Sequence, residues 1–258
     1  MDTTAERWAM LEPHMRQVGP DDDRARPAVL LFHGCGGLRD HLPLYAEAAK
    51  AAGIRAFIID SYAPRGWSRA FALATVCTGM RLRGWARAGD VMAAIHGLSQ
   101  RPDVDGSRMA LAGWSHGGWA IMEALSAPRA MAGEMLLRDP AAADLSGVKA
   151  VFLAYPYVGV AATGRFRAWR HCPKTLAIIA ARDHLTTVRN AERVLDVACG
   201  HVEIERWTVD GTHAFDEPTG AGPMRHDQAL TDEALKRFAG FLGAALELDG
   251  PVPPESGG

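Results

Sequence analysis

The sequence predicts an α/β fold with a mostly parallel central sheet and helices on both faces. Short apolar runs alternate with longer helix-like segments, and five of the six runs are almost continuously apolar. Such runs are typical of strands covered on both faces, and the alternation favours parallel βαβ units. The expected strands are Ala28–Phe32, Ile54–Ile59, Arg108–Ala112, Ala150–Ala154, Thr175–Ala180 and Val202–Thr208. The expected helices are His41–Ala52, Ala88–Ser99, Gly117–Ser126, Thr187–Ala198 and Asp227–Leu246.

The length and composition favour one large domain. The chain has 258 residues, of which 48% are hydrophobic, enough for a sizeable core. We expect an N-terminal extension over residues 1–26 and the α/β domain over 27–247. The tail 248–258 is rich in Pro, Gly and Ser and is expected to be disordered. Residues 127–147 interrupt the alternation and form a candidate lid.

The charge and hydropathy restrict the partners. A formal net charge of −2 gives no reason to expect nucleic acid or an anionic membrane as partner. No apolar run approaches the ~20 residues of a membrane span. Residues 1–20 have no apolar core of a signal peptide, so a cytoplasmic location is expected. The sequence leaves a homodimer open.

The most informative motif is Gly113-Trp114-Ser115-His116-Gly117, between an expected strand and an expected helix. Gly-x-Ser-x-Gly in this context predicts a nucleophile elbow, a tight turn that exposes the serine at the carboxyl edge of the sheet. Glycine is needed on either side because a side chain there would collide with neighbouring backbone. The alternative is a glycine-rich turn with an idle serine.

A serine nucleophile needs a histidine base, and the base needs an acid that orients it. In this architecture they follow in the order Ser, Asp, His, each after a later strand. Asp183 follows the strand Thr175–Ala180, and His213 follows the last expected strand. The sequence therefore predicts a Ser115–His213–Asp183 triad, although another nearby acid remains open as the orienting group.

The segment His33-Gly34-Cys35-Gly36-Gly37 follows the first parallel strand and predicts an oxyanion-binding loop. The expected donors are the backbone N–H groups of His116 and of Cys35, with Gly36 as an alternative to Cys35, and we expect His33 to have a structural role. Cys35 as a thiol nucleophile is a weaker alternative because it lies outside the elbow. A phosphate-binding loop is also disfavoured, since neither common glycine-rich phosphate motif is present.

The cysteines do not predict a metal or redox site. They are Cys35, Cys77, Cys172 and Cys199, and no two form a C-x-x-C pair. We expect buried free thiols and no bound metal, with a Cys77–Cys172 bridge left open.

On these motifs the chain resembles the dienelactone hydrolase family of α/β-hydrolases, from about residue 28 to 241. The resemblance rests on Leu31–Leu38, on Asp60-Ser61-Tyr62-Ala63-Pro64-Arg65-Gly66, on the elbow, and on the segments around Asp183 and His213. It implies an α/β-hydrolase fold and a hydrolase without an added cofactor. The enzyme that gives the family its name uses a cysteine nucleophile, whereas this chain has Ser115.

The serine favours hydrolysis of a small-molecule carboxylic ester through an acyl-enzyme. Tyr62, Trp67 and Trp114 are candidate substrate-binding residues for a small apolar or aromatic acyl group, with core packing as the alternative. A substrate carboxylate would find candidate partners in Arg65, Arg69 and Arg81, although solvated arginines are the simpler interpretation.

Two other functions remain open. An amidase or peptidase would use the same triad, although the chain lacks the large extra domain of gated oligopeptidases. A non-catalytic binding protein on a hydrolase scaffold is the second, and it would not need the triad.

Overall fold

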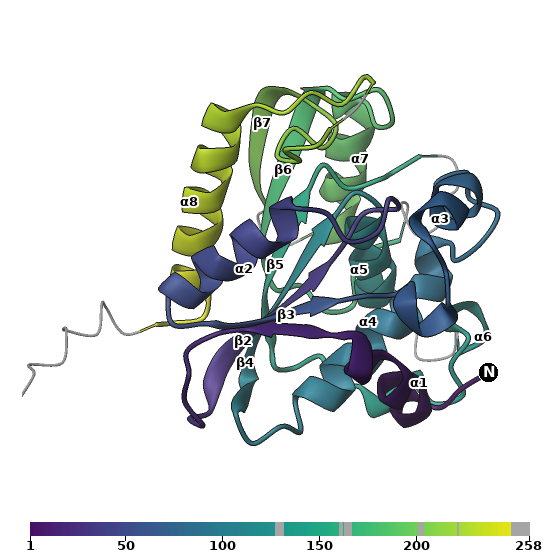
Figure 1. Ribbon diagram of the computed structural model, residues 1–258, viewed down its shortest axis with the longest axis vertical. Helices are drawn as coiled ribbons and strands as arrows, with labels where there is room; N and C mark the ends of the chain where they lie inside the picture. Colours follow the sequence, from purple (N-terminus) through teal and green to yellow (C-terminus); the bar gives the residue numbers. More distant parts are fainter. Residues whose placement is uncertain (127–131, 160–161, 163–166, 201–203, 221, 249–258) are drawn as a thin grey trace, which may run out of the picture.

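The computed structural model contains a seven-stranded sheet in the order β1-β3-β2-β4-β5-β6-β7 (Figure 1). It describes residues 1–126, 132–159, 162, 167–200, 204–220 and 222–248. The strands are β1 (Arg16–Val18), β2 (Arg26–Phe32), β3 (Arg55–Ile59), β4 (Val104–Trp114), β5 (Val148–Ala154), β6 (Lys174–Arg182) and β7 (Ile204–Thr212). All six expected strands are confirmed over the described residues (202–203 lie outside them), and each pairs in parallel with its neighbours among those six.

Helices cover both faces of the sheet, as predicted (Figure 1). On one face, α2 (His41–Ala51) packs beside α8 (Gln228–Ala245). On the other face lie α4 (Gly84–Leu98), α5 (His116–Ser126) and α7 (Val188–Ala198). Successive strand residues point to opposite faces, so β2 gives Leu30 and Phe32 to one core and Val29 and Leu31 to the other.

The N-terminal residues belong to the domain, contrary to the expected extension over 1–26. β1 pairs antiparallel with β3 at the edge of the sheet. Before it, α1 (Thr4–Leu11) packs on α4 and buries Trp8 and Leu11. The Thr3 side chain accepts a hydrogen bond from Glu6 N, and the Glu6 carboxylate accepts one from Thr3 N. This capping box stabilises a helix that is too short to give a clear periodic signal in the sequence.

The described part of the candidate lid packs beside the N-terminal helix. It contains α6 (Ala132–Met135) and the short 3-10 helix η3 (Pro140–Ala142), both in contact with α4. Asp139 accepts hydrogen bonds from the backbone and hydroxyl of Thr4. Residues 127–131 and the expected tail from 249 onward lie outside the described residues.

All four cysteines form disulfides, which corrects the expectation of free thiols. Cys35 pairs with Cys77, and Cys172 pairs with Cys199. The Cys77–Cys172 bridge that the sequence left open does not form. Spacing alone cannot reveal such pairs, because pairing depends on Cα atoms that the fold brings to 5.1 and 5.8 Å from one another.

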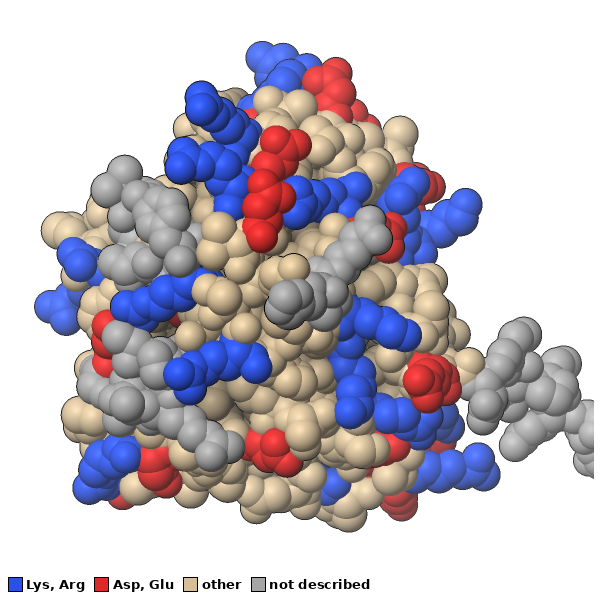
Figure 2. All heavy atoms as spheres, turned by 180° about the vertical axis from the view of Figure 1, so that it is seen from behind, with Lys and Arg blue, Asp and Glu red and all other residues tan. Residues whose placement is uncertain are grey.

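The surface carries both signs of charge. On the face that Figure 2 shows, basic and acidic side chains are intermingled. Many are paired at short range, as in Arg237–Glu233 on α8 and Arg206–Asp196. Within the described ranges, no helix has the length and apolar character needed to cross a membrane.

Candidate active site

Ser115 lies in a sharp turn between β4 and α5 and has a φ of 50°. This left-handed conformation is strained for a residue with a side chain. A Cβ on Gly113 would lie 2.6 Å from the backbone N of Gly118, and one on Gly117 would lie 2.0 Å from the carbonyl oxygen of Phe32. Both glycines are therefore required by close backbone contacts, as the motif predicts.

The structure brings Ser115, His213 and Asp183 into one hydrogen-bonded chain. His213 Nε2 lies 2.8 Å from Ser115 Oγ, and His213 Nδ1 lies 2.7 Å from Asp183 Oδ2. The carboxylate can only accept, so Nδ1 carries the proton and Nε2 is free to accept from the serine hydroxyl. All three side chains are largely buried.

Asp183 is held in place by the loop that follows β6. Its Oδ1 accepts hydrogen bonds from the backbone N–H groups of Leu185 and Thr186, at 2.7 and 3.0 Å. This leaves Oδ2 for His213. The sequence had left another acid open for this position, but Asp210 lies exposed and pairs with Arg182 instead.

The predicted oxyanion loop lies directly beside the elbow, because β2 and β4 are neighbours in register. Phe32 is opposite Gly113, and a Cβ on Gly34 would be 3.7 Å from Ser115 Cβ. His33 has the expected structural role: its Nδ1 donates to Gly34 O, and its Nε2 accepts from Ser61 N. Burial lowers the pKa of His33 well below its usual value, which keeps the ring neutral.

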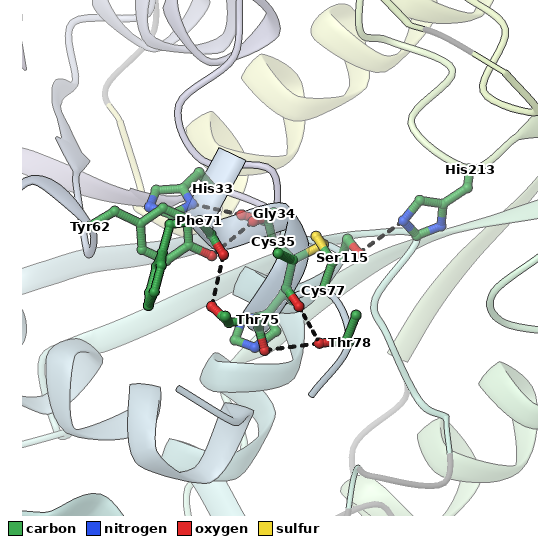
Figure 3. The surroundings of a disulfide bond; sticks show 12 residues. His33, Gly34, Cys35, Tyr62, Phe71, Thr75, Cys77, Thr78, Ser115 and His213 are labelled. Atoms are coloured by element: carbon green, nitrogen blue, oxygen red, sulfur yellow. Dashed lines mark hydrogen bonds between the residues drawn. A yellow bond between two sulfur atoms is a disulfide. The ribbon is translucent and has the colours of Figure 1, made fainter. Parts of the chain in front are cut away.

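The oxyanion loop is also tied to the segment that contains α3 (Arg69–Thr75). Figure 3 shows the Cys35–Cys77 disulfide beside Ser115, with Tyr62 on the other side of the loop. The Tyr62 hydroxyl donates to Cys35 O at 3.0 Å. Burial raises the pKa of Tyr62 to about 12, so this phenol remains a donor.

A cavity of about 290 Å³ opens at Ser115, near the lower limit of ~300 Å³ for small-molecule sites. Its apolar lining comes from Leu73, Trp114, Tyr155, Leu185, Ala214 and Met224. The Arg39–Glu217 ion pair and Arg69 line its polar part.

Of the three candidate substrate-binding residues, the structure places one at the cavity and two away from it. Trp114 lines the cavity, whereas Tyr62 and Trp67 pack behind the oxyanion loop in a small cluster with Ala72 and Val76. The two rings pack against each other, with Cys35 packed against the same cluster, and neither lines the cavity, so the structure does not place them where the sequence analysis expected a substrate contact.

The three candidate arginines are divided in the same way. Arg69 lines the cavity, but Arg65 forms an ion pair with the buried Asp90. Arg81 lies over the ring of Phe71 and outside the lining. Of the three, Arg69 alone is placed to meet a substrate carboxylate.

A buried carboxylate beneath the cavity was not predicted. Asp216 is fully buried and accepts hydrogen bonds from Tyr45, Tyr155 and the indole N–H of Trp114. These contacts fix two side chains of the cavity wall, Trp114 and Tyr155. The position three residues after His213 was the only signal in the sequence, and it does not distinguish Asp216 from a solvated acid.

The sheet order, the strand–Ser115–helix turn and the position of His213 after the last strand together define an α/β-hydrolase fold. Comparison with protein-family models finds no matching model, and comparison with curated proteins finds no matching protein.

Solved structures do match, over most of both chains. Thermogutta terrifontis esterase 2 phosphorylated by paraoxon has a TM-score of 0.67 and 17% identity, and covers 92% of this chain and 90% of its own. The propionate-bound form of that esterase has a TM-score of 0.66 and 17% identity, with 92% and 91% covered. A putative dienelactone hydrolase from Klebsiella pneumoniae has a TM-score of 0.64 and 12% identity, with 89% and 92% covered. These likenesses confirm the predicted fold.

Proposed function

We propose that this chain is a serine carboxylic-ester hydrolase in which Ser115, His213 and Asp183 form the catalytic triad. The observation that carries the proposal is the chain of hydrogen bonds from Ser115 Oγ through both ring nitrogens of His213 to Asp183, at the wall of a cavity. This order of nucleophile, base and orienting acid is the one that serine hydrolases use. The similar structures are those of an esterase and a putative dienelactone hydrolase, which adds support.

In the proposed reaction, Ser115 Oγ attacks the ester carbonyl while His213 Nε2 takes the hydroxyl proton. Asp183 holds the histidine tautomer and stabilises the imidazolium. The backbone N–H groups of Cys35 and His116 donate to the oxyanion of the tetrahedral intermediate. The C–O bond to the alcohol then breaks, and His213 returns the proton to the alcohol oxygen. Water enters by the reverse steps, releasing the acid and the free serine.

The size of the cavity favours a short or compact acyl group. A volume of about 290 Å³ is at the small end of the range for small-molecule sites, and most of the cavity wall is apolar. Solved structures of the similar esterase hold propionate and butyrate, which are short acids. We therefore propose small apolar esters as the substrate class.

The experiment is intact-mass measurement after brief treatment with a fluorophosphonate, in which the serine oxygen displaces fluoride from phosphorus. We expect one adduct on the wild type and none on Ser115→Ala. Ser107→Ala is the matched control, because Ser107 bonds to Asp105 far from the cavity, and it should be labelled like the wild type. The similar esterase is phosphorylated by paraoxon, which supports the choice of a phosphorus-based probe.

Two results would contradict the proposal. A wild type without an adduct favours a binding protein on a hydrolase scaffold, and an adduct that persists in Ser115→Ala excludes Ser115 as the nucleophile. If labelling succeeds, matched ester and anilide substrates then separate the esterase from an amidase. A larger kcat/KM for the anilide would overturn the preference for esters.

A further inference from the structure

Arg87 is a fully buried cation on α4, behind the proposed oxyanion hole. Its guanidinium contacts three side-chain or backbone groups, and none of them is a carboxylate. Within the described ranges, no acidic oxygen lies at ion-pair distance from it. Burying a charge without a paired carboxylate is costly, so a role for this cation beyond packing is expected.

The first contact is with the oxyanion loop. Arg87 Nη1 donates to the carbonyl oxygen of His33 at 2.7 Å, and Arg87 Nε donates to Ser61 Oγ at 3.0 Å. Ser61 N in turn donates to the ring of His33. The arginine therefore holds the peptide immediately before Gly34 and Cys35, where the first oxyanion donor lies.

The second contact is with the residue that supplies the other donor. Arg87 Nη1 lies 3.1 Å from His116 Nδ1, so the neutral ring accepts there and carries its proton on Nε2. Burial, with the adjacent Arg87 charge, lowers the pKa of His116 to about 3. The His116 ring therefore stays neutral and does not compete with His213 for the proton of Ser115. The ring also packs edge-on against Trp119, which fixes its orientation.

The charge of Arg87 also suits the reaction. Burial lowers the pKa of Arg87 from its usual value, but an arginine stays protonated in proteins. Its partners His33 and His116 are neutral, and Ser61 is uncharged. The carboxylates of Asp60 and Asp90 act on this cation at longer range, but no anion among the described residues contacts it. Its positive potential therefore favours negative charge that develops on the neighbouring substrate oxygen.

We propose that Arg87 is a positioning residue that holds both halves of the oxyanion hole, Cys35 N–H and His116 N–H, in register for the tetrahedral intermediate. The inference rests on the proposed ester hydrolysis. Arg87 does not contact the substrate, and it acts through His33 O and His116 Nδ1. Losing one oxyanion donor costs about 10²-fold or more in kcat, and we expect a loss of that order when both donors are loosened.

The test compares kcat and KM for p-nitrophenyl acetate in the wild type, Arg87→Met and Arg87→Lys. We expect Arg87→Met to lose about 100-fold in kcat with KM changed less than about threefold, because the interaction matters in the transition state. Arg87→Lys should recover part of the loss, since an ammonium can reach one partner but lacks the fork that reaches two. A trifluoromethyl ketone, which forms an oxyanion adduct, should lose affinity in proportion to kcat/KM.

Arg55→Met is the matched control. Arg55 is another buried arginine that donates to backbone carbonyls, those of Pro20, Asp22 and Asp103, but it lies at the opposite edge of the sheet. We expect its melting temperature to fall and its kcat to stay within about twofold of the wild type, because no oxyanion donor depends on it.

The outcomes separate the inference from the proposed function. A wild type that neither hydrolyses esters nor reacts with the fluorophosphonate overturns both. An active wild type with a folded Arg87→Met of unchanged kcat overturns the inference alone, as does an equal kcat loss in Arg55→Met. If Arg87→Met does not fold, Arg87→Lys decides: reduced kcat at an unchanged melting temperature supports the inference, and unchanged kcat overturns it.

Discussion

Each of two edges of the sheet, the one where the parallel strands end and the one where they begin, is held by a buried arginine and a disulfide. At the carboxyl edge, where the parallel strands end, Arg87 and the Cys35–Cys77 disulfide hold the loops around Ser115. At the amino edge, where they begin, Arg55 and the Cys172–Cys199 disulfide hold the connections that enter the strands. The difference between the edges lies in strain and in charge.

Strained backbone conformations occur around the cavity at the carboxyl edge. Three residues with positive φ, Ser115, Tyr155 and Ala214, line the same cavity. Such conformations cost about 1–3 kcal/mol each and persist only where the surrounding packing over-determines them. Asp216 accepts a hydrogen bond from Tyr155 itself and another from Trp114, the residue before Ser115, and so restrains two of these segments.

The buried arginines at the two edges also differ in the charge of their partners. Arg55 forms ion pairs with Asp22 and Asp103, so the amino edge neutralises its buried cation. Arg87 has only neutral partners. The comparison indicates that the buried arginine is paired with carboxylates at one edge, whereas at the other it contacts no anion in the described part of the chain, which is what the proposed support of the oxyanion hole requires.

The largest effect is expected from Asp183→Asn. An amide cannot accept from His213 Nδ1–H in the same way and favours the wrong tautomer, so kcat should fall by about 10⁴-fold. Asp103→Asn, at the amino edge, should reduce stability and leave kcat unchanged because its partners are Arg55 and Arg101. Steady-state kinetics with thermal melting of both variants checks this, and an active Asp183→Asn would exclude the proposed orienting acid.

The second-largest loss of kcat is expected from one of two alanine substitutions, at glycines that lie equally close to a backbone oxygen. A Cβ on Gly117 would lie 2.0 Å from Phe32 O, and a Cβ on Gly147 would lie 1.9 Å from Gly106 O. Each alanine variant should lose about 1–3 kcal/mol of stability by overpacking. Only Gly117→Ala displaces the elbow, and a 1 Å displacement costs about 10²-fold in kcat. Comparable kcat losses in both variants would show that the two edges do not differ in their importance for catalysis.

The two disulfides are expected to differ in activity more than in stability. Their chain separations of 42 and 27 residues correspond to about 4 and 3.5 kcal/mol of chain-entropy stabilisation. Cys77→Ser should lower kcat/KM several-fold because the oxyanion loop loses its link to a cavity wall, whereas Cys172→Ser should not.

Activity and melting temperature of these variants, with and without a phosphine reductant, check the disulfide prediction. Reduction should mimic Cys77→Ser and have no further effect on its activity, and equal activity in all forms would contradict the prediction.

The last prediction concerns stability and no change in kcat, and it distinguishes the two edges by the pH at which their contributions are lost. Burial lowers the pKa of His33, His41 and His116 at the carboxyl edge. Below pH ~6.5 the unfolded chain binds protons at these rings and the folded chain does not, so the free energy of unfolding should fall as pH decreases, by up to about 1.4 kcal/mol per pH unit for each ring.

At the amino edge the pH window is lower. The hydrogen bond from Arg26 lowers the pKa of Asp22 to about 2, so its contribution is present above pH ~3.8 and is lost only below it. Urea unfolding at pH 7.5, 6 and 5 should therefore report the histidines alone. His116→Gln should make the slope shallower, and a stability that does not change between pH 7 and 5 would contradict this assignment.

Much of the fold was predictable because its signals are local. The apolar runs of β2 to β7 and the Gly-x-Ser-x-Gly motif around Ser115 are patterns that can be recognised within a few residues, although the contact that requires glycine at position 117 is with the distant Phe32. The order Ser115, Asp183, His213 also follows from topology, since parallel strands end at one edge and place the loops after them together.

The features that the sequence did not predict depend on distant contacts. Arg87 contacts partners that are 54, 26 and 29 positions away, at His33, Ser61 and His116. Tyr62 and Trp67 carry the composition of a substrate pocket, but the fold turns them behind the oxyanion loop. The four cysteines show no spacing signal, and their pairing follows from the positions of α3 and α7.

The sequence by itself determined the fold class and named Ser115, His213 and Asp183 as the candidate triad, because apolar runs alternating with helical segments and a Gly-x-Ser-x-Gly turn are short patterns. Only the tertiary structure decided which side chains face the cavity, which acid contacts His213, and how the oxyanion loop is braced. Those outcomes depend on distances between segments far apart in the chain, which packing sets and no short pattern encodes.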